Sequence, residues 1–109
     1  MMLLSATTLI GDDIKNASGE SLGKIEDFMI DTDRGDIKYA VLTFGGFLGM
    51  GNKLFAVPIE ALTLDASDKC FVMNVSKERL ENAPGFDKDN WPNTADLTWQ
   101  QSISDYYRF

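Results

Sequence analysis

Short turn motifs divide this chain at intervals that leave room for strands but for few long helices. The motifs are rich in Gly, Asn and Asp, which supply left-handed backbone positions and local side-chain hydrogen bonds that reverse a chain. They occupy residues 16–20, 32–36, 45–52 and 65–69. The segments between them predict strands over Leu22–Asp31, Ile37–Phe44, Lys53–Val57 and Cys70–Val75, with shorter candidates at Asp13–Lys15 and Leu62–Leu64. The expected fold is therefore mainly β, a small closed or partly open barrel of about six short strands, with short helices and a C-terminal helix.

The segment predicted as the strand Ile37–Phe44 carries apolar residues on both faces. In its second half Val41 lies on one face, while Ala40 and Leu42 lie on the other. A strand covered on a single face would carry polar residues on the opposite face throughout. We therefore expect the barrel interior to cover one face, and a helix or a second subunit to cover the other.

Two short helices are expected before the C-terminal region. Residues 58–62 are typical of a single helical turn, because Pro58 stands at a permitted first-turn position. Ser76 can cap a helix over Lys77–Asn82, and Glu78 lies near the positive end of that helix.

The C-terminal region, residues 83–109, is expected to be an ordered loop and a helix that pack on the barrel, residues 1–82, or on a partner subunit. Residues 85–92 are too polar for a strand and predict a loop held by Phe86 and Trp91. The helix is expected to begin at Asn93 or Thr94 and to run toward Tyr107. It carries an apolar stripe at spacings i, i+4, i+7 and i+8, formed by Trp99, Ile103, Tyr106 and Tyr107.

Charge and hydropathy exclude several classes of partner. The net charge is −7, and the ten Lys and Arg residues are scattered, so the chain has no basic stripe for phosphate backbones or anionic lipid. No apolar run approaches the roughly 18 residues of a membrane span, and the opening Met1–Leu4 is too short for a signal-peptide core. We expect a cytoplasmic protein that neither binds nucleic acid nor inserts into a membrane.

The residue types needed for most catalysis are missing. The chain has no histidine, which removes the usual general base and the commonest transition-metal ligand, and its one cysteine, Cys70, lies in an apolar run typical of a buried thiol. A structural zinc site would need four Cys or His ligands. We expect no enzyme, no cofactor and no metal site.

The acidic residues between positions 12 and 36 leave one alternative open. Residues 31–36 resemble the start of a calcium loop, but Gly35 holds the fifth position and Leu42 the twelfth, where an EF-hand has oxygen ligands. A hairpin turn is the favoured interpretation of residues 31–36. A cation-binding or proton-relay domain that uses these acidic turns stays as the alternative function.

A glycine-rich segment at residues 46–53 is the last motif with a chemical interpretation. The phosphate-loop pattern requires Gly-Lys-Ser/Thr, whereas here Asn52 precedes Lys53 and Leu54 follows it, so nucleotide binding is not expected. Its apolar side chains either fold over the end of the barrel or contact a partner, and the C-terminal stripe has the same two possibilities. The candidate interaction surface therefore consists of Phe47, Leu48, Met50, Trp99, Ile103, Tyr106 and Tyr107.

Several segments together resemble one known family. They are Gly11-Asp12-Asp13, residues 23–31 (Gly-Lys-Ile-Glu-Asp-Phe-Met-Ile-Asp), Tyr39–Leu42, residues 44–49 (Phe-Gly-Gly-Phe-Leu-Gly) and Phe55–Pro58. This combination resembles the PRC-barrel family over about residues 3–80, and residues 82–87 are similar to the tail of bacterial single-domain members. The resemblance implies a small β-barrel without catalytic residues. The family occurs in the cytoplasmic part of the photosynthetic reaction centre H subunit, in a ribosome maturation factor that contacts a ribosomal protein, and as stand-alone proteins.

Docking onto a larger assembly is the function that these settings share. We expect neither the transmembrane helix of the H subunit nor the additional N-terminal domain of the maturation factor in this protein. We therefore expect a non-enzymatic protein-interaction module, a homo-oligomer with a dimer favoured, whose protein partner is not identified. A reaction-centre-associated protein is a further alternative that the resemblance leaves open.

Overall fold

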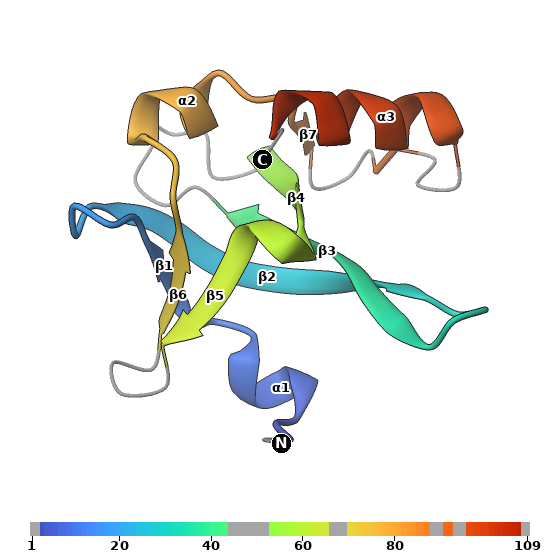
Figure 1. Cartoon of the computed structure of the whole chain (residues 1–109), viewed down its shortest axis with the longest axis horizontal. Helices are drawn as coiled ribbons and strands as arrows, with labels where there is room; N and C mark the ends of the chain where they lie inside the picture. The colour runs from blue at the N-terminus through green and yellow to red at the C-terminus, as the bar shows by residue number, and fades with distance from the viewer. Residues whose placement is uncertain (1–2, 44–52, 66–69, 88–90, 93–95, 108–109) are drawn as a thin grey trace.

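One curved sheet forms the body of the protein (Figure 1). The structure, a computed structural model, describes residues 3–43, 53–65, 70–87, 91–92 and 96–107. Within these residues the sheet has seven strands in the order β5-β6-β1-β2-β3-β4-β7. The strands are β1 (Asp13–Lys15), β2 (Ser21–Asp31), β3 (Asp36–Thr43), β4 (Lys53–Pro58), β5 (Leu62–Asp65), β6 (Cys70–Met73) and β7 (Phe86–Asp87).

The sheet is mainly antiparallel and open. All neighbouring strands pair antiparallel except β1 and β6, which are parallel, and β5 and β7 are its two outer strands. The predicted mainly β fold is thus confirmed in its partly open form. Six of the strands lie where the turn spacing predicts them, with ends shifted by no more than two residues.

The β2–β3 hairpin is the longest unit of the sheet, and its distal end projects beyond the rest of the molecule (Figure 1). Its turn confirms the predicted hairpin. Asp31 Oδ1 accepts hydrogen bonds from the backbone N–H groups of Asp33 and Arg34, at 3.0 and 3.2 Å. Gly35 has φ +75° and donates its N–H to the Asp31 carbonyl at 2.7 Å, a left-handed position that favours glycine.

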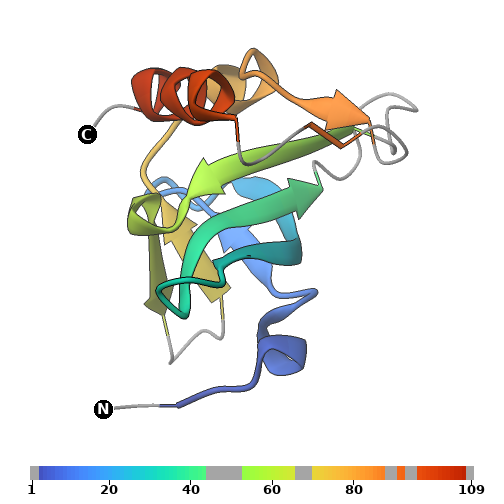
Figure 2. The same cartoon turned by 90° about the vertical axis from the view of Figure 1, so that its right-hand side faces the viewer.

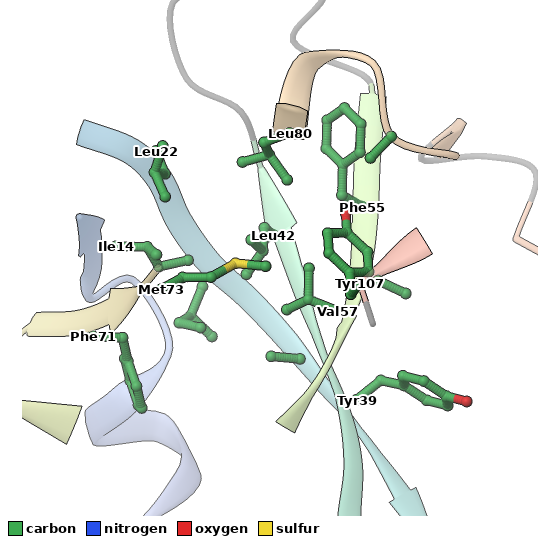
Figure 3. Packing of buried hydrophobic residues seen from close by; sticks show 14 of the residues in the cluster. Ile14, Leu22, Tyr39, Leu42, Phe55, Val57, Phe71, Met73, Leu80 and Tyr107 are labelled. Atoms are coloured by element: carbon green, nitrogen blue, oxygen red, sulfur yellow. The ribbon is translucent and has the colours of Figure 1, made fainter. Parts of the chain in front are cut away.

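The core lies inside the curve of the sheet, where side chains of β1, β2 and β6 meet those of β3 and β4, and the helices add residues such as Leu80 at one end (Figure 3). The expected cover of the third strand on both faces is confirmed, because four consecutive residues of β3, from Tyr39 to Leu42, are all buried. Part of the second cover is the C-terminal helix, whose Trp99 contacts Tyr39. The largest fully buried side chains are Ile14, Leu22, Ile25, Leu42, Leu54, Met73, Leu80, Ile103, Val41 and Val57.

Short helices flank the sheet on two sides. The helices α2 (Lys77–Glu81) and α3 (Leu97–Tyr106) lie on one side, and α1 (Ala6–Leu9) lies on the opposite side (Figure 2). The helical turn predicted at residues 58–62 is present as the 3₁₀ helix η1 (Ile59–Ala61). The predicted cap of α2 is confirmed, because Ser76 Oγ accepts a hydrogen bond from the Arg79 N–H at 3.1 Å.

The structure corrects two expectations and adds one element. The segment predicted as an ordered loop and judged too polar for a strand contains β7, because Phe86 and Asp87 pair with Leu54 and Lys53 at the free edge of β4. The C-terminal helix begins at Leu97, where the side chain of Asp96 caps it, and not at Asn93 or Thr94, which lie outside the described residues. The helix α1 is additional; Ser5 caps it, and it contains no buried residue.

Candidate interaction surface

The structure describes four of the seven residues that were predicted to form one interaction surface. Phe47, Leu48 and Met50 lie outside the described residues. All four residues of the C-terminal stripe pack on the chain's own sheet and helices, and their exposure differs. Ile103 and Tyr107 are buried, with 1% and 3% of their surface exposed, whereas Trp99 and Tyr106 are half-buried.

The stripe attaches α3 to the sheet at successive turns of the helix. Trp99 makes an edge-to-face contact with Tyr39 of β3, with ring centroids 5.3 Å apart and planes at 71°. Ile103 and Tyr107 belong to the same apolar cluster as Phe55 and Val57 of β4, the strand on which α3 packs (Figure 3). We call the surface of β3 and β4 that this helix covers the α3 seat.

A pair of residues joins the end of α3 to α2. The guanidinium group of Arg79 donates a hydrogen bond to the Tyr106 carbonyl, and the Tyr106 hydroxyl donates one to the Arg79 carbonyl. The guanidinium carbon also lies 4.9 Å from the centre of the Tyr106 ring, in cation–π geometry. This reciprocal contact is the α2–α3 latch.

The hydroxyl group of Tyr107 is a polar atom buried beside the latch. Its oxygen is buried from solvent, and no group in the described part of the chain forms a hydrogen bond with it. Burial raises the pKa of this phenol far above its ordinary value; the neighbouring Tyr106 adds to the shift and Arg79 opposes it. The phenol therefore stays neutral, and its desolvation costs free energy that no described hydrogen bond offsets.

The surface near Tyr107 is hollowed. A cavity of about 340 Å³ opens there between η1, the end of β6, α2 and the end of α3. Its walls are Glu60, Ala61, Met73, Asn74, Val75, Arg79 and Tyr107. The carboxylate of Glu60 and the guanidinium of Arg79 bring opposite charges to one cavity.

A second hollow, of about 380 Å³, lies between the β2–β3 hairpin and α3. Beside it the hairpin presents Ile30, 59% exposed, and Ile37, 36% exposed, and these two residues face each other across the strands. Sequence reasoning missed this pair. The signal was present, because Phe28, Met29 and Ile30 are three successive apolar residues, more than one buried face of a strand can hold. The hollow is lined by Met29, Ile30, Asp31, Thr32, Asp33, Lys38, Tyr39 and Gln100.

The acidic turns do not assemble a cation site in the described part of the chain. No group of three His, Cys, Asp or Glu residues in it lies close enough to hold a metal ion. Asp31 is engaged by the backbone of its own turn, and Asp36 forms an ion pair with Arg34 at 3.1 Å. Cys70 is a buried free thiol, as predicted. Within the same residues, no helix has the length and apolar character needed to cross a membrane.

Comparison with known families agrees with this architecture. The family model of the PRC-barrel domain matches residues 1–80. The chain therefore belongs to the PRC-barrel family, whose domains are known as protein-interaction or assembly modules and are generally non-enzymatic. The helix α3 lies outside the matched residues. No curated protein matches the sequence.

Proposed function

We propose that this PRC-barrel protein is a non-enzymatic module that docks on a larger protein assembly in the cytoplasm. The observation that carries the proposal is the Ile30–Ile37 pair on the projecting end of the hairpin. A single exposed apolar side chain is normal on a protein surface. Two of them paired on a projecting hairpin, beside a hollow that also contains Met29 and Tyr39, form a more continuous apolar surface, which is typical of an interaction site.

The charge around this surface indicates the character of the partner. Asp31 and Asp33 line the hollow together with a single base, Lys38, and the whole chain has a net charge of −7. Opposite charges across an interface accelerate encounter and discourage wrong partners. We therefore propose that the partner presents an apolar contact surface surrounded by basic residues.

Affinity purification from the protein's own cells, followed by mass spectrometry, tests the proposal with three tagged chains. In the first variant Ile30→Thr and Ile37→Thr remove the apolar pair but keep β-branched side chains, which suit a strand. In the matched control Leu97→Thr removes an apolar side chain that is 77% exposed on α3. We expect the wild type and the control to recover the same partner and the hairpin variant to lose it. Recovery of that partner by all three chains would contradict the proposal, as would the absence of any specific partner.

Self-association as a dimer is a separate part of the proposal. Multi-angle light scattering at micromolar concentration measures it directly. A monomeric mass over the whole concentration range would remove the dimer and leave the hairpin test unaffected.

A further inference from the structure

We propose that the α3 seat is a groove for an amphipathic helix of a partner protein, and that α3 occupies this groove until the partner helix replaces it. This inference rests on the interaction function proposed above, and it assigns a second surface and the kind of partner that fits it.

The way in which α3 is attached is typical of a helix bound in a groove. The helix lies outside the residues that match the family model, and it packs on β4, inside them. It uses three side chains at spacing i, i+4 and i+8, namely Trp99, Ile103 and Tyr107. This face extends over about 12 Å of helix. Apolar anchors spaced along one face are how an amphipathic helix is recognised in a groove.

The attachment of α3 is also weak. Within α3 itself Ile103 is the buried residue, and Tyr107 follows as the C-terminal cap. The rest of the attachment includes the edge contact of Trp99 and the α2–α3 latch, which involves the exposed end of Arg79. Hydrogen bonds and cation–π contacts at exposed sites compete with water, so each contributes only a modest net free energy. A helix of ten residues is also too short to be stable by itself.

The buried hydroxyl of Tyr107 has no hydrogen-bond partner in the described part of the chain. When α3 occupies the seat, this hydroxyl is removed from water and its hydrogen bond to water is not replaced. This cost disfavours the state in which α3 is seated. A partner helix with an aromatic–aliphatic–aromatic stripe whose last residue is Phe would not carry this cost. Such a helix is therefore the occupant that the groove fits best.

The test uses the full chain and two synthetic peptides labelled with a fluorophore. The probe peptide has the sequence of residues 96–107 with the substitution Tyr107→Phe, and the control peptide also carries Ile103→Asp. Fluorescence anisotropy measures peptide binding to three full-length proteins: the wild type, Arg79→Ala and Tyr107→Phe. The first substitution loosens the chain's own helix because it removes the guanidinium contacts of the latch, and the second seats that helix more firmly. The two changes should therefore move binding in opposite directions.

The fraction of molecules in which α3 has left the seat sets the apparent affinity of the protein for the probe peptide. We expect the probe to bind Arg79→Ala about fivefold more tightly than the wild type, and Tyr107→Phe about fivefold more weakly. The control peptide should bind none of the three. Equal binding to all three proteins, or no binding to Arg79→Ala while its sheet remains folded by circular dichroism, would overturn the inference. Neither result would affect the hairpin test of the proposed function.

Light scattering of Arg79→Ala distinguishes the partner helix from a second copy of the chain. The same oligomeric state in Arg79→Ala as in the wild type supports the partner helix as occupant. Additional, concentration-dependent association of Arg79→Ala that the probe peptide dissociates would show instead that copies of the chain exchange α3, and it would overturn the proposal of a separate partner protein.

Discussion

The buried hydroxyl of Tyr107 makes the substitution Tyr107→Phe a sensitive test of how α3 packs. In the structure its oxygen is excluded from water and forms no hydrogen bond with any described group. Leaving such a group unsatisfied costs about 1–3 kcal/mol. Loss of the hydroxyl also leaves a small void, so we take the lower end of that range and expect Tyr107→Phe to stabilise the protein by about 1 kcal/mol. For a domain of about 100 residues this corresponds to a rise in Tm of about 4–8 °C.

Tyr106→Phe is the matched control on the adjacent residue. The Tyr106 hydroxyl donates a hydrogen bond to the Arg79 carbonyl, so its removal should destabilise the protein by about 0.5–1.5 kcal/mol. Urea unfolding followed by far-ultraviolet circular dichroism gives both values, with an unchanged m-value as the check that the denatured state is unaffected. If Tyr107→Phe instead destabilises the protein by about 1 kcal/mol or more, the hydroxyl has a hydrogen-bond partner. The buried hydroxyl would then no longer support the proposal that α3 can be replaced by a partner helix.

Three further predictions concern pH, a helix cap and a turn. Because burial raises the pKa of Tyr107 above its ordinary value of 10.0, the unfolded chain loses this proton first as the pH rises. The contribution of Tyr107 to the free energy of unfolding should therefore be constant below pH 10 and fall above it, so the free energy of unfolding should fall less steeply with pH in Tyr107→Phe. Equal slopes for the two proteins, measured by urea unfolding across this pH range, would refute the raised pKa of Tyr107. Ser76→Ala should cost about 1 kcal/mol because it removes the cap of α2, whereas Ser76→Asp keeps a capping oxygen; equal losses in thermal unfolding would show that the cap does not matter. Gly35→Ala should cost about 1–2 kcal/mol from the left-handed backbone alone, since a Cβ there meets no atom within 4 Å. Gly35→Asn should cost less, and the opposite order in urea unfolding would contradict this reading of the turn.

The strands could be predicted because their ends are fixed locally. The turn at residues 31–35 carries its own signals, an Asp that binds backbone N–H groups and a Gly at a left-handed position. Most strands therefore begin and end within two residues of the prediction. The strand β7 could not be predicted, because its two residues have no strand pattern of their own. They become a strand only through pairing with the free edge of β4.

The candidate surface was less accessible to sequence reasoning. Helical spacing places Trp99, Ile103 and Tyr107 on one face of α3, but the spacing does not say which surface receives that face. The receiving surface is built from β3 and β4, which pairing across the sheet brings together. Ile30 and Ile37 likewise become one surface only through the register of the hairpin. The latch between Arg79 and Tyr106 joins residues 27 positions apart and has no local sequence signal.

Site-specific photo-crosslinking in the protein's own cells tests the central claim, an interaction module that uses the hairpin, most directly. A photoreactive amino acid replaces Ile30 in one chain. In the control chain it replaces Ala17, which is exposed in the turn before β2, at the other end of that strand (Figure 1). The account predicts a discrete crosslinked product with a second protein from position 30 and none from position 17. No product from position 30, or the same products from both positions, would contradict it.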